Sequence, residues 1–405
     1  MNHQVEVEQA VDLLLAQPVW LNSQIIPVAA ARGRVAAAAL FAPEMSPAFD
    51  RSPFDGYAVR GEETAAAARE RPAVFRVTQE IRAGDWPSQG IGPGCAAKIL
   101  TGAPLPPGAN TTVKYEHTEF SADQVKIFQP LPPGTNVVRA GEGVRQGEAL
   151  IQAGTLVTPP VTGLLAGVGI ATVPVYRRPL VTLFSTGSEL LPLTEPLRPG
   201  LTRDSNYYTL SGFLAENGLE TRAGGLLADD PDLIAGHVAA ALETSDCVLT
   251  SGGVSVGDYD YLATVGEKLG GKPLFSKVAM KPGGCLLATV INGKLLLGLS
   301  GSPGAAVTGL IRVALPYLRK LCGRQEPLPR EITARLAEDF PKESRTRRFL
   351  QGRLLIREGQ AWFSRPQCQG NAMLKALVGC DMLADIPAGS PRLAKGDKVR
   401  LYPYA

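Results

Sequence analysis

The stretch of sequence that decides the fold is CVLTSGGVSVG, residues 247–257. It begins as a short apolar run and passes directly into a turn rich in glycine and serine. Two further apolar runs end in the same way: residues 180–185 lead into a TGSE turn at 186–189, and residues 295–299 lead into an SGSPG turn at 300–304. Near-continuous apolar runs of this length are typical of parallel strands that are covered on both faces.

The segments between these runs have the length and the apolar spacing of helices. One expected helix spans residues 206–217, and another spans residues 231–243. The second follows Asp229 and Asp230, where a carboxylate can cap the helix, and Pro231 suits its first turn. Alternating strands and helices predict a doubly wound α/β domain over residues 177–322.

The rest of the chain predicts three further parts, so the fold class is multidomain α/β plus β. Short β-type runs separated by glycine and proline predict a β-rich domain over residues 46–140. Residues 1–45 and 141–176 predict a connector domain with helical and extended segments, including an amphipathic helix at residues 5–15. Alternating runs return after residue 323 and predict a C-terminal β-barrel over residues 323–405.

The composition is that of a globular protein. The 405 residues are 45% hydrophobic and 20% charged, and 41 basic side chains nearly balance 38 acidic ones. The resulting net charge of +3 argues against a nucleic-acid partner, and no apolar stretch is long enough for a membrane helix. Six cysteines without a Cys-x-x-Cys pair and three histidines give no zinc-site spacing. We expect a reducing, cytoplasmic location.

Glycine-rich turns at the carboxyl ends of parallel strands are where such sheets bind ligands. Glycine lets the backbone approach a ligand, and successive amide groups with hydroxyl side chains can hold phosphate oxygens. One such turn is common for geometric reasons alone, whereas three on one sheet edge indicate a site for a phosphorylated small molecule. None matches the phosphate-binding loop of NTPases or the Gly-x-Gly-x-x-Gly fingerprint. The expected binding residues are Thr186, Gly187, Ser251, Gly252, Gly253, Ser255, Gly257, Ser300, Gly301, Ser302 and Pro303.

Carboxylates follow two of these turns. Glu189 closes the first, and Asp258 and Asp260 follow the second. A phosphate beside carboxylates calls for a divalent cation, and Mg²⁺ takes one or two carboxylates together with phosphate oxygens. Glu189 and Asp260 are therefore candidate metal ligands, and helix capping is the alternative role.

Two lysines provide positive charge near the same edge. Lys277 and Lys281 are four residues apart, a spacing that places both on one side of a strand. A solvated strand face would give the same pattern. Residues 323–405 add 15 basic against 9 acidic side chains, which is either a solvated surface or a rim that attracts anions.

Four motifs occur in the order found in the MoeA/gephyrin family of molybdopterin molybdenumtransferases. They are SPFDGYAVR at residues 52–60, LTGAPLP at 100–106, STGSEL at 185–190 and SGGVSVG at 251–257. Four separated motifs in this order are a specific signal, and the resemblance spans nearly the whole chain. The chain is identified as a divergent member of that family, which implies a MoaB/Mog-like α/β domain.

The resemblance implies an enzyme of molybdenum cofactor biosynthesis. Its substrates would be molybdate and adenylylated molybdopterin, its product besides the cofactor would be AMP, and Mg²⁺ would assist. It would act as a homodimer whose site is shared between subunits, in contact with a MogA-type adenylyltransferase and molybdoenzyme maturation factors. Carried over from the family's motifs, the catalytic residues would be Asp55, Thr101, Glu189, Asp229, Asp260, Lys277 and Lys281.

The chain departs from the family's motifs at Asn110, Gly143, Ser188, Gly284, Cys285, Ser300 and Ser302. These changes remove three carboxylates and one cation from regions expected to line the crevice. Besides a full transferase, they are compatible with a catalytically weakened pterin-binding or scaffold paralogue and with an altered metal-oxyanion preference. A different nucleotide-handling enzyme built on the same α/β module is a further alternative. Molybdate and tungstate both fit the motifs.

Overall fold

The computed structural model describes residues 4–19, 21–254, 261–366, 370 and 374–404. Its α/β part contains a six-stranded mixed sheet in the order β15-β12-β16-β20-β19-β17. Those strands span Glu220–Leu227, Leu180–Thr186, Cys247–Ser251, Lys294–Leu299, Leu287–Ile291 and Lys272–Phe275. The first four are mutually parallel, as the apolar runs predicted, whereas β19 and β17 add an antiparallel edge. The doubly wound α/β domain is thus confirmed.

Helices cover both faces of this sheet. One face packs against α1 (Val7–Leu15), α3 (Asn206–Glu216), α6 (Pro303–Gly309) and α7 (Leu315–Leu321), and the other against α4 (Pro231–Thr244) and α5 (Tyr261–Lys268). The Asp230 carboxylate caps α4 by accepting hydrogen bonds from the amides of Asp232 and Leu233. A π-helical turn, η4 (Leu310–Ala314), joins α6 to α7. No helix among the described residues combines the length and apolarity needed to cross a membrane.

The connector is built from two segments that are distant in sequence. β2 (Ser23–Pro27) pairs antiparallel with β11 (Thr172–Tyr176), and β3 (Leu40–Phe41) pairs with β10 (Ala149–Ile151). The helix α2 (Pro159–Gly167) packs beside η1 (Val28–Ala30). Residues 7–15, which we assigned to the connector from the sequence, instead form α1 and pack on the α/β sheet.

The β-rich part contains a second six-stranded sheet in the order β7-β4-β6-β5-β9-β8. These strands span Thr111–Lys114, Gly56–Val59, Cys95–Ile99, Ala73–Ile81, Gln124–Ile127 and Thr118–Phe120. The C-terminal part is a closed barrel in the order β21-β23-β22-β24-β25, spanning Ile332–Leu336, Gln360–Ser364, Arg348–Arg357, Met382–Ile386 and Lys398–Pro403. The barrel closes on its own core, which includes Phe363 and Leu401.

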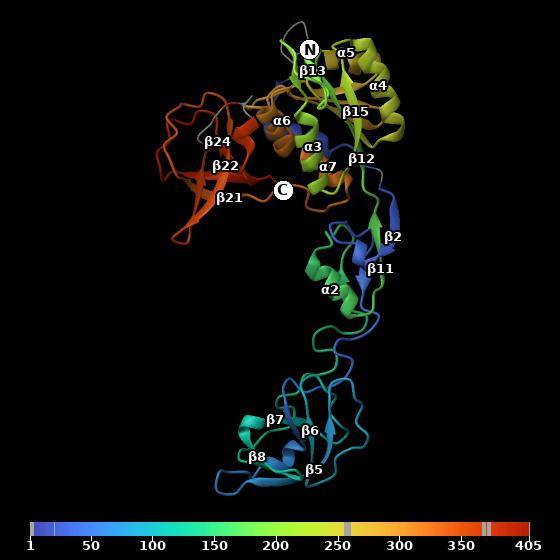
Figure 1. Cartoon of the computed structure of the whole chain (residues 1–405), viewed down its shortest axis with the longest axis vertical. Coiled ribbons are helices and arrows are strands. Elements are labelled where there is room, and N and C mark those ends of the chain that lie inside the picture. Colours follow the sequence, from blue (N-terminus) through green and yellow to red (C-terminus); the bar gives the residue numbers. More distant parts are fainter. Residues whose placement is uncertain (1–3, 20, 255–260, 367–369, 371–373, 405) are drawn as a thin grey trace.

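The four parts are arranged along an elongated molecule (Figure 1). The α/β part and the barrel lie together at one end, the β-rich part lies at the other, and the connector separates them. Asp55 directly precedes β4 in the β-rich part and is therefore remote from the glycine-rich turns of the same chain. A site that uses both cannot form within one chain in this arrangement.

A group of ion pairs, which we call the interdomain ion-pair cluster, joins α1 to the barrel. Arg347 donates two hydrogen bonds to the Asp385 carboxylate, at 2.9 and 2.7 Å, and one to each carboxylate oxygen of Glu8, both at 2.7 Å. Arg400 Nη2 lies 3.3 Å from Asp385 Oδ2, the oxygen that also accepts from Arg347 Nη2. Asp385 is 2% exposed, so its charge depends on these arginines for compensation.

Candidate functional site

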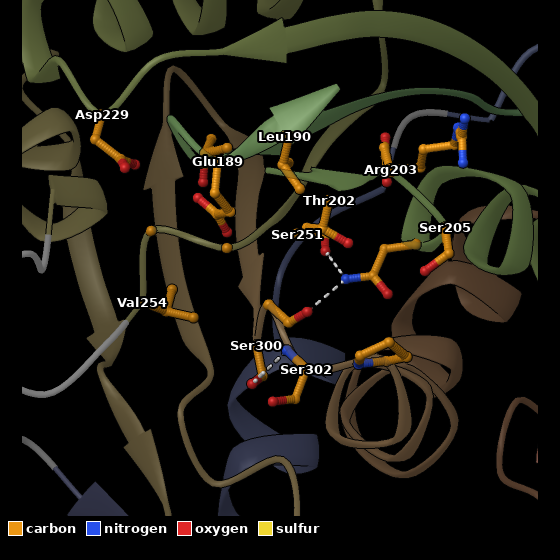
Figure 2. Close-up of a pocket in the computed structure, with 18 of the residues that line it drawn as sticks. Glu189, Leu190, Thr202, Arg203, Ser205, Asp229, Ser251, Val254, Ser300 and Ser302 are labelled. Atoms are coloured by element: carbon orange, nitrogen blue, oxygen red, sulfur yellow. Dashed lines mark hydrogen bonds between the residues drawn. The ribbon is translucent and has the colours of Figure 1, made fainter. Parts of the chain in front are cut away.

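A pocket of about 600 Å³ lies at the carboxyl edge of the α/β sheet (Figure 2). Its walls are the turns that follow β12, β16 and β20, together with the segment that precedes α3. These turns meet because the carboxyl ends of adjacent parallel strands lie at one edge of a sheet. The pocket collects Thr186, Gly187, Glu189, Asp229, Ser251, Gly252, Gly253, Ser300, Gly301, Ser302 and Pro303, all of which we expected at the site.

Three expected residues of the second turn, Ser255, Gly257 and Asp260, lie outside the described residues. Their assignment as binding or metal-ligating residues stays a prediction. The described part of that turn ends at Val254, which lines the pocket.

Two glycines allow the second turn to lie against the first. Gly252 has φ +99°, and a Cβ there would lie 2.3 Å from the Thr186 carbonyl oxygen and 2.8 Å from Thr186 Oγ1. Gly253 has φ +72° and would place its Cβ 3.1 Å from the same hydroxyl. Residues with a side chain rarely adopt this backbone region, so glycine is needed both for the conformation and for the close approach.

Hydroxyl groups line the floor beneath the turns. Ser185 Oγ, Thr186 Oγ1 and Thr250 Oγ1 are buried and have no hydrogen-bond partner within the part of the chain that the structure describes. Thr186 also lines the pocket. Buried hydroxyls are normally hydrogen-bonded, but these three oxygens are covered by the surrounding chain, so they lie beneath the pocket and are not part of its accessible surface.

Asn206 is a pocket residue that the sequence reasoning missed. Its side-chain amide donates to Ser251 Oγ at 2.5 Å and to the Gly301 carbonyl at 2.8 Å, as the dashed lines in Figure 2 show. It therefore holds the second and third turns together. The Asp204-Ser205-Asn206 triplet was the available signal, but polar residues before a helix are usually read as caps.

Charged groups in the pocket are mostly acidic. Glu189, Asp204 and Asp229 line it, opposed by Arg203. Asp229 is tied to the first turn, because its carboxylate accepts from the Ser188 amide at 3.2 Å and its own amide donates to Ser188 Oγ at 3.3 Å. Within the described residues, no three His, Cys, Asp or Glu side chains converge as an all-protein metal site.

The two lysines do not share a strand, so the expected arrangement is wrong. β18 contains only Lys277 and Val278, and the chain turns directly after it, where the Met280 amide donates to the Val278 carbonyl at 2.7 Å. The Lys281 amide donates instead to the Arg347 carbonyl at 2.9 Å. Both lysines nevertheless line one pocket of about 340 Å³, which shares Cys285, Ser300 and Ser302 with the pocket at the sheet edge.

Asp55 and Thr101 form a pair of their own in the β-rich part. Asp55 Oδ1 accepts hydrogen bonds from the Thr101 hydroxyl and the Thr101 amide, both at 2.7 Å. These bonds, first the hydroxyl and then the amide, lower the pKa of the fully exposed Asp55 carboxyl. The pair is thus an anionic group on a fixed turn, remote from the α/β pocket of the same chain.

The departures from the family's motifs fall in different places. Asn110 is structural in the β-rich part, since its Oδ1 accepts from the Gly61 amide at 2.8 Å and its Nδ2 donates to Glu62. Gly143 donates its amide to Ser46. Neither residue lines the pocket of the same chain, and the expectation that they line a crevice between subunits stays a prediction.

Gly284 has no room for a side chain in this backbone. A Cβ at this position would lie 2.5 Å from the Met280 carbonyl oxygen and 2.7 Å from the Val278 carbonyl oxygen. Its own carbonyl accepts the Val278 amide at 2.9 Å, which closes the turn after β18. The missing lysine is therefore accompanied by a tight turn that excludes it.

Gly252→Ala is expected to weaken ligand binding at the pocket by about tenfold or more, because a Cβ would push the second turn away from Thr186. Binding of AMP followed by calorimetry measures the change. Gly236→Ala, in α4 and outside the pocket lining, is the matched control, because a Cβ there would meet nothing within 4 Å. Equal affinities in the two variants would contradict this reading of the turn.

Models of three protein-family regions match successive parts of the chain. Residues 5–169 match the MoeA N-terminal region (domain I and II), residues 182–320 match a probable molybdopterin binding domain, and residues 333–404 match the MoeA C-terminal region (domain IV). Together they cover the connector, the β-rich part, the α/β part and the barrel.

Whole-chain relatives agree with these matches. The molybdopterin molybdenumtransferase of Bacillus subtilis is 37% identical, covering 88% of this chain and 84% of the relative, and that of Nostoc is 33% identical, covering 93% and 88%. The solved structure of a molybdopterin biosynthesis MoeA protein from Pyrococcus horikoshii superposes with a TM-score of 0.85 at 28% identity, covering 99% of this chain and 100% of that one. The chain belongs to the MoeA family of molybdopterin molybdenumtransferases.

Proposed function

We propose that this protein inserts molybdenum from molybdate into adenylylated molybdopterin, with release of AMP, during molybdenum cofactor biosynthesis. The observation that carries the proposal is the pocket formed by three glycine- and serine-rich turns, in a chain similar over its length to proteins named molybdopterin molybdenumtransferases. That full-length similarity favours the transferase over a scaffold paralogue or a different nucleotide-handling enzyme. The cytoplasm, where thiols stay reduced, is the proposed compartment.

The pocket suits a phosphorylated ligand of this size. Its volume of about 600 Å³ is in the range of small-molecule sites. The Gly187 and Gly252 amides already donate to the Leu227 and Leu299 carbonyls, so the proposed donors for phosphate oxygens are the amides of Gly253 and Gly301, which also line the pocket. Adenylylated molybdopterin would lie across the second and third turns, which Asn206 holds together.

Mg²⁺ fits the donor set of the pocket, and we include it in the proposal. Mg²⁺ prefers one or two carboxylates with substrate phosphates over an all-protein cage, and Glu189 and Asp229 both line the pocket. Bound there, the cation would neutralise phosphate charge. Asp260 is a further candidate ligand from the sequence. Glu189 and Asp229 would hold the cation, while the turns orient the phosphate.

Molybdate is the proposed occupant of the adjoining pocket. This doubly charged oxyanion would be held by Lys277 and Lys281, which both line that pocket. The shared residues Cys285, Ser300 and Ser302 place it beside the first ligand. Neighbouring pockets bring two reactants together and reduce the entropic cost of their reaction.

The proposed site is completed by a second subunit. Asp55 and Thr101 are carried over as catalytic residues, yet they lie at the opposite end of the chain from the pocket. In an antiparallel homodimer, the β-rich part of each subunit would lie against the α/β part of the other. Asp55 of the partner subunit would then face this pocket and transfer protons to or from the reacting groups. A MogA-type adenylyltransferase and molybdoenzyme maturation factors are the proposed protein partners.

AMP release tests the function directly. The purified protein is mixed with adenylylated molybdopterin, Mg²⁺ and molybdate, and AMP is measured by chromatography. We expect release that depends on molybdate. Tight binding of the substrate without AMP release would support a scaffold instead.

Mixing two impaired variants tests the shared site, with the substrate kept well below the wild-type KM so that the weakened binding of Gly252→Ala limits its rate. Asp55→Asn and Gly252→Ala chains, combined by co-expression, should recover about a quarter of wild-type activity, because half of the random dimers carry one fully native site of two. Each variant alone, expressed at the same level, is the control. If each site were built from one chain, the mixture would be no more active than the average of its two components.

A further inference from the structure

An exposed tryptophan, Trp86, lies at the same end of the β-rich sheet as Asp55. Neighbouring strands β5, β6, β4 and β7 carry one row of paired residues, which are Ile81, Ile99, Gly56 and Lys114. The segments beyond this row leave the sheet together. They are residues 82–86 after β5, residues 100–104 after β6 and residues 49–55 before β4. We call these three segments the Asp55 end of the sheet.

Contacts within the Asp55 end join its three segments. A Cβ on Gly102 would lie 4.0 Å from the Cβ of Ala83, so the turn after β5 borders the turn that carries Thr101. The Gly102 amide donates to the Ser52 carbonyl at 2.8 Å, which joins that turn to the segment before β4. Residues 82–86 are thus packed beside the proposed catalytic pair.

The indole ring of Trp86 is held in place and yet faces solvent. Trp86 is 73% exposed, and its ring meets that of Phe49 edge to face, with ring centroids 5.8 Å apart. The turn before it is closed by Asp85, whose carboxylate accepts from the Arg82 amide at 3.3 Å and whose own amide donates to the Arg82 carbonyl at 3.0 Å. An exposed ring that its neighbours already hold loses little conformational entropy when it binds a ligand.

The α/β pocket lacks what this ring offers. Adenylylated molybdopterin carries two flat heterocycles, a pterin and an adenine. Stacking on an aromatic side chain is a common way for a protein to hold such a ring. Among the described residues that line the pocket, none is aromatic. A flat ring bound there would therefore find no stacking partner in the described part of its own chain.

We propose that Trp86 of the partner subunit stacks on a flat ring of the substrate bound in this pocket. The inference rests on the proposed function and on its shared site, in which the Asp55 end of one subunit faces the pocket of the other. Because Trp86 and Asp55 lie at the same end, the contact that binds the heterocycle would also align the substrate with the group that transfers protons. Trp86 is thus a binding residue of the shared site.

Calorimetric binding of adenylylated molybdopterin tests the proposal, with molybdate left out so that AMP release is not expected. Trp86→Leu keeps an apolar side chain but removes the flat ring, so the affinity should fall by about tenfold or more. Trp86→Phe keeps a smaller ring and should lose less than about threefold. Val74→Ala, which removes exposed apolar surface from the other end of β5, is the control and should bind as the wild type does.

Three results would overturn the proposal. Wild-type affinity in Trp86→Leu would show that the ring does not contact the substrate. Equal losses in Trp86→Leu and Trp86→Phe would show that a flat ring is not the group that matters. Size-exclusion chromatography at the same concentration covers the third: if Trp86→Leu lost affinity because its dimer dissociated, Trp86 would be a subunit-interface residue instead.

AMP as a second ligand identifies the ring. A parallel loss of AMP affinity in Trp86→Leu assigns the adenine, and unchanged AMP affinity with weaker binding of the full substrate assigns the pterin. The outcome is separable from that of the transferase test. AMP release by the wild type together with normal binding by Trp86→Leu would contradict only this inference, whereas Trp86-dependent binding without AMP release would contradict only the transferase proposal.

Discussion

Asp55→Asn is expected to lower the rate of AMP release by about 10²- to 10⁴-fold, the range for loss of a group that transfers protons. Hydrogen bonds from Thr101 lower the pKa of Asp55, so its carboxylate is charged at neutral pH. Asparagine keeps the size and an acceptor for Thr101, but it removes the charge and the ability to take a proton. Steady-state measurement of kcat with saturating substrate gives the effect.

The control for Asp55 is Glu119→Gln, an exposed carboxylate of the same sheet whose partner is Lys126. We expect wild-type activity from that variant. The fold of Asp55→Asn should be unchanged, since the side chain is fully exposed. If kcat of the Asp55→Asn enzyme were within twofold of the wild-type value, Asp55 would not be a catalytic residue.

The lowered pKa of Asp55 also fixes the direction of its pH dependence. A carboxyl with a depressed folded-state pKa stays ionised until the pH falls below its ordinary value, about 3.9. Asp55 is therefore not the source of any change in rate between about pH 5 and 8. Thr101→Val removes the hydroxyl that contributes most to the shift, so the acidic limit of activity should move to higher pH.

Asp385→Asn is expected to lower the free energy of unfolding by about 3–5 kcal/mol. The change breaks the interdomain ion-pair cluster at its buried member and leaves Arg347, whose side chain is 11% exposed, without its main counter-ion. Urea unfolding followed by circular dichroism measures the loss. Glu8 retains its bonds to Arg347 but is exposed and screened, so it offsets little of the cost.

A surface pair provides the comparison for Asp385. Arg198 and Glu195 form an ion pair whose side chains are 60% and 46% exposed, and Glu195→Gln should cost less than about 1 kcal/mol. A comparable small loss in Asp385→Asn would show that the barrel is held to α1 by apolar packing instead. Limited proteolysis between residues 323 and 332 should become faster in Asp385→Asn if the barrel detaches.

Much of the α/β fold was predictable because its signals are local. The apolar run before Ser251 and the capping carboxylate of Asp230 identify β16 and α4 from a few consecutive residues each. The antiparallel strands β19 and β17 were not predicted, since pairing direction depends on distant residues. The amphipathic pattern of α1 gave a helix but could not identify the sheet on which it packs.

The site was predictable to the extent that topology determines it. The rule for parallel sheets brought the turns at Gly187, Gly252 and Gly301 to one edge. Asn206 was missed because its contacts cross to two other turns, which a cap-like sequence does not reveal. The lysine arrangement was wrong because a four-residue spacing carries no information about where the strand ends.

The turn at Gly284 limits how the adjoining lysine-lined pocket can be redesigned. A lysine introduced at position 284 by one substitution would meet the carbonyl oxygens of Met280 and Val278, so the added charge would come with a distorted turn. A design that adds positive charge to this pocket therefore has to place it at another lining residue, where the backbone leaves room for a side chain.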